Sequence, residues 1–403
     1  MRQTAWAMQG LILCAVLVAF YRAGTFDFLR PKLPVIDVPN HPAPSDNGWD
    51  ALASAAARVD THSSAIHAAW DAEVGSVPPM PAEVTEILAD AREALRNECV
   101  HAHPPGQLHD LPYADDMRRL VRMMVLEARR LEGSGEHGEA ARIYVDGLRV
   151  GPVVARNGGV IDWLSGGAIT SIVTPDLSRC IGSGEMERAD LEWLIEALAT
   201  RERDVVPFHE ALAIEWVVLD QEYADMAAGE ARDGERMGWG AAVITEPVRR
   251  GLHKGLAKAI ESAKDPTRVG PLELRKTGSM MADMLLQVHT ESASRGPQRQ
   301  AMLTGLRVHA AAQLHRLQTG EFPASLDELQ LAPPATDPHT HGPMLYELRD
   351  DGYVVYSAGP DRVDDGGTLR LHRQTREGDL IIWPAGGTVR PREKKPAAAP
   401  PPG

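Results

Sequence analysis

Apolar residues recur every three to four positions through most of the chain, which is the period of an amphipathic helix. After Pro81, one face of the segment carries Val84, Ile87, Leu88, Ala91 and Leu95. We predict helices over Trp49–Glu73, Ala82–Val100, Asp115–Leu131, Glu136–Val150, Arg188–Arg201, Val206–Ala228, Thr245–Ala263 and Leu272–Ser292. Together these segments predict a mainly helical domain over residues 49–293.

Two of these segments resemble a helical pair of the tetratricopeptide (TPR) kind. Met117–Leu131 and Glu136–Val150 are separated by the turn sequence Gly133-Ser134-Gly135. Ala140, Ala141 and Tyr144 would be the small and aromatic packing positions of the second helix. The domain is therefore predicted to be TPR-like or irregular helical.

The stretch Gly158–Val173 is nearly uncharged, so it could be either a membrane span or a buried helix. It is only about sixteen residues long, which is short for a span. It also contains Asp162 and four glycines, and Pro175 follows it. A buried helix that ends near Pro175 is the better prediction.

The spacing of apolar residues along the chain changes in the part that follows Gly296-Pro297. Gln298–Gln318 keeps a helical stripe, and the apolar residues alternate from Met344 onward as in strands. The sequence predicts a hairpin with its turn at Asp350-Asp351-Gly352, and a closing strand over Asp379–Trp383. Residues 298–387 are therefore predicted to be a helix followed by a small antiparallel sheet, which makes the whole chain α+β.

The amino terminus has the features of a membrane anchor. Ala5–Tyr21 carries no charge and is about as long as the shortest membrane-spanning helix. No small-residue cleavage site follows it, so residues 1–24 are predicted to be an uncleaved transmembrane signal-anchor. Residues 25–48 are predicted to be a linker, with five prolines within Pro31–Asn47. Residues 388–403 are predicted to be a disordered tail.

Membrane orientation follows from two opposing rules. Arg22, Arg30 and Lys32 follow the anchor and only Arg2 precedes it, which taken literally places the large part of the chain in the cytoplasm. A single amino-terminal anchor before a long domain is more often oriented outward. We expect a single-pass protein of the inner (cell) membrane with its bulk periplasmic or otherwise extracytoplasmic.

The overall charge narrows the range of partners. The formal net charge is -14 at pH 7, and no stripe of Lys and Arg is interleaved with aromatic residues. Such a chain lacks the positive field that attracts a phosphate backbone. We therefore expect no nucleic-acid partner. The membrane is expected as a partner because of the predicted amino-terminal helix.

Three short motifs follow one another in the carboxy-terminal part of the chain. Their residues are Gly320, Phe322, Pro323, Leu326 and Leu329, then Asp337, Pro338, Gly342, Pro343 and Tyr346, then Tyr353, Ser357, Gly359 and Asp361. In this order and spacing they resemble the carboxy-terminal domain of major (G-type) pseudopilins of type II secretion. Similar modules occur in large membrane-anchored envelope proteins of planctomycete-like bacteria, and the whole chain resembles those more than a pilin.

The chain also departs from the pseudopilin pattern. A pseudopilin has a glutamate five residues after its leader glycine, whereas Ala15 stands at that distance from Gly10. More than 270 residues separate the apolar segment from the predicted sheet, so no continuous helical spine is formed. The resemblance therefore implies a module used for folding or interaction and not for filament assembly.

The turn Tyr356–Gly367, YSAGPDRVDDGG, has two interpretations. In the first it is a solvated turn in which Asp361 caps its own backbone and Asp364–Gly367 form a second turn. In the second, a hard cation relieves the repulsion of the crowded aspartates. In the pseudopilins that this loop resembles, the corresponding segment holds calcium. The resemblance implies a structural Ca²⁺ site built from Ser357, Asp361, Asp364 and Asp365 and closed by Asp379.

Other metal-binding patterns are weaker. The histidine pairs that could bind a transition metal are His101/His103 and His339/His341. Both lie in proline-flanked loops and neither has a helical or C-x-x-C frame, so we expect solvated loop histidines. Cys99 and Cys180 could form a disulfide, but they fall in separate helical segments, and two buried free thiols are the better prediction.

No stretch matches a nucleophile elbow, a phosphate-binding loop or a zinc-protease helix, so no catalytic residue is assigned. The acidic pairs Asp115/Asp116 and Glu127/Glu132 fit solvated helix faces. We expect a membrane-anchored, non-enzymatic envelope scaffold that engages envelope or secretion-system proteins.

The alternative is an envelope hydrolase with an unrecognised active site in the helical domain. Its discriminating feature would be a deep pocket that encloses several of Asp162, His209, Glu210, Glu215 and Glu222.

Overall fold

The computed structural model describes residues 33–101, 112–228, 241–265, 277, 279–350, 352–368, 371 and 377–384. The helices are α2 (Trp49–Arg58), η2 (Val59–His62), α3 (Ser63–Ala69), α4 (Ala82–Ala94), α5 (Pro112–Gly133), α6 (His137–Ala155), α7 (Val160–Gly182), α8 (Arg188–Arg203), α9 (Phe208–Ala228), α10 (Ala241–Lys264), α11 (Met280–Ser292), α12 (Arg295–Thr319) and η3 (Leu326–Leu329). The strands are β1 (Leu345–Arg349), β2 (Gly352–Ser357) and β3 (Leu380–Trp383). A mainly helical chain with one small antiparallel sheet confirms the α+β class.

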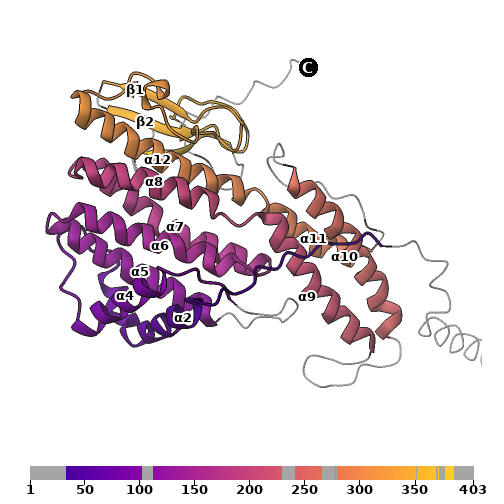
Figure 1. Cartoon of the computed structure of the whole chain (residues 1–403). Coiled ribbons are helices and arrows are strands. Elements are labelled where there is room, and N and C mark those ends of the chain that lie inside the picture. The colour runs from indigo at the N-terminus through magenta and orange to yellow at the C-terminus, as the bar shows by residue number, and fades with distance from the viewer. Residues whose placement is uncertain are drawn as a thin grey trace, which may run out of the picture.

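We call α2–α8, α12 and the sheet the body, and α9–α11 the arm. Figure 1 shows α5, α6, α7 and α8 lying side by side in the body, with α12 between α8 and the sheet. One hydrophobic core runs from Trp49 in α2 to Ile382 in β3. The core therefore continues across Gly296-Pro297, where the sequence pattern changes. Pro297 is tolerated there because it falls in the first turn of α12, which needs no backbone N–H from it.

The sheet has the order β1-β2-β3 with antiparallel pairing, and Tyr346 lies opposite Val355 in the predicted hairpin. Two glycines let the helices approach the sheet closely. A Cβ atom on Gly305 of α12 would lie 2.5 Å from Ile382, and one on Gly182 of α7 would lie 1.9 Å from Trp383. Larger side chains at these positions would push the sheet away from the body.

The helical pair predicted around Gly133-Ser134-Gly135 is confirmed as α5 and α6, which pack directly on one another. Gly135 has φ +86°, the left-handed conformation that ends many helices, and the N–H of Glu136 donates to the carbonyl of Leu131 at 2.8 Å. The predicted buried helix is also confirmed as α7. Its predicted end is wrong, because α7 continues through Pro175 to Gly182.

The helix predicted over Ala82–Val100 is too long, since α4 ends at Ala94. Among the described residues, no helix combines the length and apolar character that a membrane crossing requires. The predicted anchor at residues 1–24 and the predicted tail at residues 388–403 lie outside the described residues.

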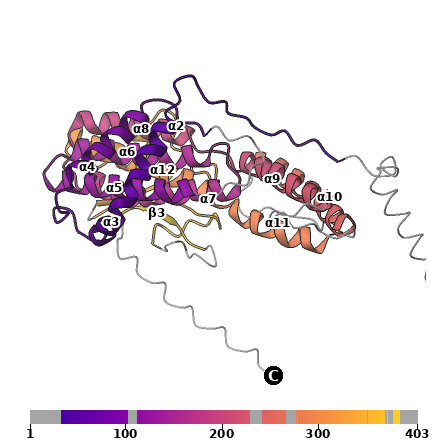
Figure 2. The same cartoon turned by 90° about the horizontal axis from the view of Figure 1, so that it is seen from below.

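The arm projects from one end of the body in both views (Figures 1 and 2). Its helices bury a separate apolar cluster that includes Leu212, Leu252 and Leu286. The described part of the predicted linker, residues 33–48, contains no helix or strand, as its prolines favour. This segment runs along the arm toward α2, and the carbonyl of Pro34 lies 2.6 Å from Nε2 of His253 in α10.

Candidate functional site

The carboxylates of the turn Tyr356–Gly367 are held by hydrogen bonds to nearby groups. Asp361 accepts from the backbone N–H of Gly378 at 2.9 Å and from that of Val363 at 3.3 Å. Asp364 accepts from the N–H of Gly366 at 2.8 Å and from the hydroxyl of Tyr356 at 3.0 Å. These are the contacts of a self-capped double turn.

Asp379 is fully buried and accepts from the backbone N–H groups of Asp365 at 3.3 Å and Gly367 at 2.8 Å. Burial raises the pKa of Asp379 to about 6, and the charges of Asp365 and Asp364 add to the rise, although the two backbone hydrogen bonds oppose it. The negative charge of Asp379 is therefore poorly stabilised at this position.

The five residues predicted to bind calcium do not form one ligand set. Ser357 is fully buried and donates to Asp337, so it faces away from the aspartates of the turn. In the part of the chain that the structure describes, the loop contains no group of three acidic, histidine or cysteine residues with ligand atoms within 4.8 Å of one another. A calcium ion would have to draw the carboxylates away from their backbone donors, and its binding stays a prediction.

The histidine pair at residues 339 and 341 divides between interior and surface. His341 is exposed as predicted, but the prediction for His339 is wrong, since His339 is fully buried. Its Nδ1 lies 2.9 Å from Oγ of Ser357, and its Nε2 has no partner among the described residues. His339 is buried because the loop folds over Ser357 at the end of β2.

Asp337, His339 and Ser357 have the residue types of a hydrolytic triad but not its geometry. Asp337 accepts from the hydroxyl of Ser357 at 2.8 Å and from the N–H groups of His339 at 2.9 Å and Ala358 at 3.1 Å. In a triad the imidazole lies between the serine and the acid. Burial acts to raise the pKa of Asp337, but its hydrogen bonds from His339 and Ser357 outweigh burial and lower it. Asp337, His339 and Ser357 are therefore a buried group that fixes the loop to the end of β2, and their burial leaves no access for a substrate.

The residues predicted for a hydrolase are engaged in separate contacts. Asp162 accepts from the hydroxyl of Tyr113 at 2.5 Å, and Glu210 lies 2.8 Å from Nε2 of His41. Glu215 accepts from the N–H of Val160 at 2.9 Å.

His209 and Glu222, the remaining two residues predicted for a hydrolase, lie on α9 like Glu210 and Glu215. Burial lowers the pKa of His209, and Glu222 is half-buried. Cavities of 220–360 Å³ lie elsewhere in the described chain, and none of them is lined by the five residues. The pocket that would favour a hydrolase is not among them.

Glu215 of α9 makes an ion pair within the arm and a hydrogen bond to the body. It lies 3.3 Å from Nε2 of His289 in α11 while it caps the first turn of α7 in the body. Burial acts to raise the pKa of Glu215, but His289 and the N–H of Val160 lower it overall. Burial acts to lower the pKa of His289, and the hydrogen bond to Glu215 and its charge raise it overall. The pair is therefore charged at mildly acidic pH.

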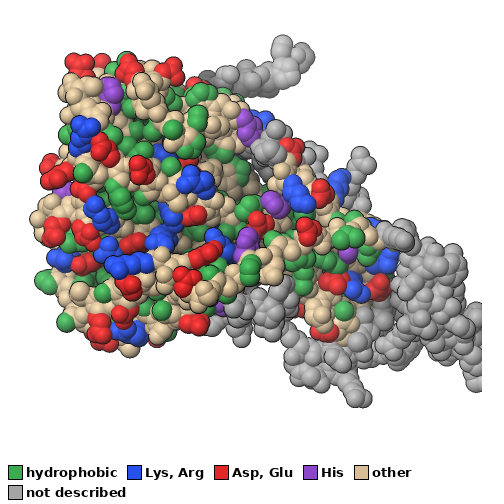
Figure 3. Space-filling model, viewed as in Figure 1, with side chains coloured by type: hydrophobic (Ala, Val, Ile, Leu, Met, Phe, Trp, Pro, Cys, Tyr) green, Lys and Arg blue, Asp and Glu red, His purple; other side chains and the backbone are tan. Residues whose placement is uncertain are grey.

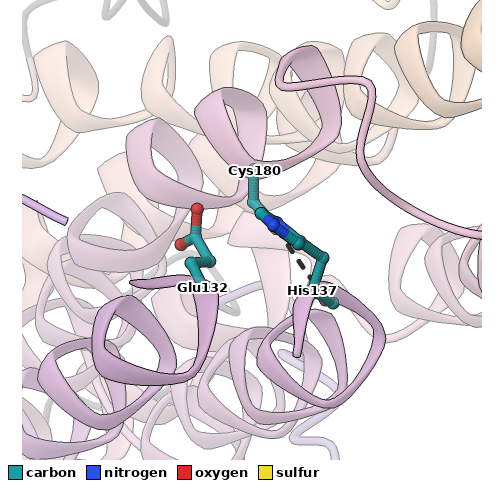
Figure 4. Close-up of side chains that lie close together, drawn as sticks. All are labelled: Glu132, His137 and Cys180. Atoms are coloured by element: carbon teal, nitrogen blue, oxygen red, sulfur yellow. Dashed lines mark hydrogen bonds between the residues drawn. The ribbon is translucent and has the colours of Figure 1, made fainter. Parts of the chain in front are cut away.

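A further group of possible metal ligands was missed by sequence reasoning. Glu132, His137 and Cys180 converge from α5, α6 and α7 with their ligand atoms within 4.8 Å of one another (Figure 4). Glu132 was predicted to be solvated, and this is wrong, because its side chain is 1% exposed. The turn between α5 and α6 could have indicated that residues 132 and 137 are neighbours, but nothing in the sequence places Cys180 beside them.

The donor chemistry of this group does not fit a metal. The carboxylate of Glu132 accepts from Arg179 at 2.6 and 2.9 Å and from the hydroxyl of Tyr144 at 2.6 Å. Burial, followed by the charge of Glu132, raises the pKa of the Cys180 thiol, whereas metal binding requires a thiolate. Cys180 and Cys99 are both buried and free, which confirms the prediction of two free thiols.

Glu132 belongs instead to a charged network in the body. Asp176 accepts from Arg129 at 2.7 and 3.0 Å and from Arg179 at 2.9 Å. Arg129 also stacks over the ring of Trp70 at 5.0 Å. Two arginines and two acids therefore neutralise one another between α5 and α7.

Comparisons with protein-family models, with curated proteins and with solved structures give no match to this chain.

Proposed function

We propose that the protein is a membrane-anchored, non-enzymatic envelope scaffold that binds another envelope protein through its arm. The observation that carries the proposal is an exposed methionine face on α11. Met280, Met281 and Met284 are 82%, 52% and 65% exposed. Positions 280, 281 and 284 share one side of a helix, and flexible thioether side chains suit an adaptable binding surface.

The arm is also the described region closest to the predicted anchor. Pro34 contacts His253 of α10, and the predicted anchor helix ends at Tyr21. A fully extended segment between these points spans roughly 45 Å at most. The methionine face would therefore lie close to a membrane, where the partner is another protein of that membrane.

The carboxy-terminal module is the second part of the proposal. The three motifs that resemble pseudopilins meet in space: the hydroxyl of Tyr346 donates to the carbonyl of Pro323 at 2.8 Å, and the rings of Phe322 and Tyr353 lie 4.6 Å apart. Their mutual packing supports a pseudopilin-like module. In this proposal the module links the protein to type II secretion-like assemblies. The helical part of the body beside it is TPR-like.

Surface charge does not offer an alternative docking face in the view of Figure 3. Acidic and basic side chains are interspersed over the body and the arm there. A mixed surface gives little long-range steering, so an apolar contact is the better basis for recognition.

Site-specific photo-crosslinking in membranes tests the scaffold. A photoreactive residue at Met284 should give one discrete adduct, identified by mass spectrometry as an envelope membrane protein. The matched control is Leu348, which is 46% exposed and belongs to β1, a strand of the body that lies away from the arm in Figure 1. Met280→Asp should abolish the adduct formed from position 284 without changing the melting temperature, because Met280 is on the surface.

The same adducts from both positions, or no adduct from position 284, would refute a binding role of the arm.

A further inference from the structure

A cavity of about 220 Å³ lies between α7, α12 and β3, away from the methionine face. Its lining residues are Leu164, Gly167, Ala168, Thr170, Ser171, Thr174, Arg295, Gln298, Arg299, Met302 and Leu380. Two of them are arginines and none is acidic. This is unusual in a chain with 56 Asp and Glu residues against 42 Lys and Arg residues.

Arg299 lacks the carboxylate that the other inner arginines have. Arg129 and Arg307 each make bidentate contacts with a carboxylate, whereas no ion pair of Arg299 exists among the described residues. Its guanidinium stacks over the ring of Trp163 at 4.3 Å and donates from Nη2 to the carbonyl of Trp163 at 3.3 Å. A guanidinium has five N–H donors, so most of them remain for a ligand in the cavity.

The position of Arg299 is set by the packing of α7. A Cβ atom on Gly167 would lie 2.1 Å from Nη2 of Arg299, so a side chain there would displace the guanidinium from its present position. The ring and the carbonyl of Trp163 hold the guanidinium at the cavity wall. An arginine fixed in this way loses little conformational entropy when it binds a ligand.

A second positive charge increases the need for an anion. Arg295 lies one turn before Arg299 in α12 and also lines the cavity. Burial, followed by the charge of Arg295, lowers the pKa of Arg299 to about 10. Like charges at this helical spacing repel, and a bound anion would convert the repulsion into two attractive contacts.

We infer that this cavity binds a small oxyanion, a phosphate group or a carboxylate, through Arg299 and Arg295. Its volume corresponds to roughly seven water molecules, which is enough for a phosphate group. Gln298 lies between the two arginines in the sequence and offers an amide donor at the same wall. The bound anion would join α7 to α12. Since α12 packs against the sheet, the anion would also stabilise the attachment of the sheet to the rest of the body. This inference is independent of the proposed scaffold function.

Thermal unfolding of the full chain tests the inference. Sodium phosphate and sodium acetate are titrated separately, with chloride adjusted to keep the ionic strength constant. At least one anion should raise the midpoint in a saturable way, by about 2–4 °C. A response to phosphate alone identifies a phosphate-type ligand, and a response to acetate identifies a carboxylate.

Two variants and a control complete the test. Arg299→Gln should weaken the apparent affinity at least tenfold. Arg122→Gln should leave it unchanged, since Arg122 also stacks over a tryptophan, Trp70, but is exposed and does not line the cavity. Ser171→Asp places a carboxylate at the cavity, so it should raise the midpoint without added anion and remove the anion response. No response of the natural chain to either anion, or an equal response in Arg299→Gln, would overturn the inference.

Discussion

The charged network between α5 and α7 and the turn Tyr356–Gly367 handle negative charge in opposite ways. In the turn, Asp361 and Asp364, which are close in the sequence, are each held by their own backbone N–H donors. In the network, Arg129, Glu132, Asp176 and Arg179 come from distant positions and pair with one another inside the body. Charge density along the sequence therefore did not indicate where the strongest electrostatic interactions lie.

The physical difference is desolvation. The side chains of Glu132, Asp176 and Arg129 are only 1%, 10% and 14% exposed, so each needs its partner to offset the loss of water. Asp361 and Asp364 stay in contact with solvent, and water can replace any protein partner they lose. Removal of one charge should consequently have very different effects in the two regions.

The largest expected effect is that of Asp176→Asn. This change leaves Arg129 without a carboxylate in a poorly solvated site, whereas Arg179 keeps Glu132. We expect the free energy of unfolding to fall by about 3 kcal/mol, as measured by urea denaturation.

Asp361→Asn is the matched control for this comparison, because it removes one aspartate charge from the solvated turn. It should change the free energy of unfolding by less than about 0.5 kcal/mol. Equal losses in the two variants would show that burial does not distinguish the two regions.

A smaller effect is expected within the arm, where the single pair of Glu215 in α9 and His289 in α11 replaces such a network. The raised pKa of His289 stabilises the contact below the unfolded value of about 6.5, and this contribution is lost as the pH rises through the folded pKa. The lowered pKa of Glu215 stabilises it above the unfolded value of about 4.5, and this contribution is lost as the pH falls through the folded pKa.

The contact should therefore be strongest between about pH 4.5 and 6.5. Hydrogen-exchange protection factors in α11 should be higher at mildly acidic than at alkaline pH, by up to about tenfold for each pKa unit.

The variant Glu215→Gln should flatten that pH profile. Its control is Asp220→Asn, which breaks another ion pair of the arm, with Arg249, but leaves Glu215 and His289 intact. A control variant that flattens the profile equally would contradict a specific role of Glu215 and His289.

The smallest expected effect concerns calcium at the turn. Because Asp361, Asp364 and Asp379 already accept backbone hydrogen bonds, an ion would replace contacts and not merely add them. We expect calcium to raise the melting midpoint of the full chain over that in chelator by no more than about 2 °C. This rise should disappear in Asp361→Asn. An unchanged midpoint of the natural chain would remove the calcium prediction.

Local patterns in the sequence predicted most of the secondary structure. Apolar periodicity located α5–α12, Gly133-Ser134-Gly135 located the turn between α5 and α6, and Asp350-Asp351-Gly352 located the hairpin. These features depend on neighbouring residues, so they are readable without knowledge of the fold. Errors arose where tertiary packing extended a helix, as in α7 through Pro175.

The sequence by itself determined most of the elements and the α+β class, because these depend on composition or on contacts within a few residues. Only the tertiary structure decided that Glu132 and His339 are buried, that Glu215 joins the arm to the body, and that Arg295 and Arg299 share a cavity without an acid. Burial and charge pairing depend on which distant segments meet. A side chain acquires its solvation and its partners only when that packing is complete.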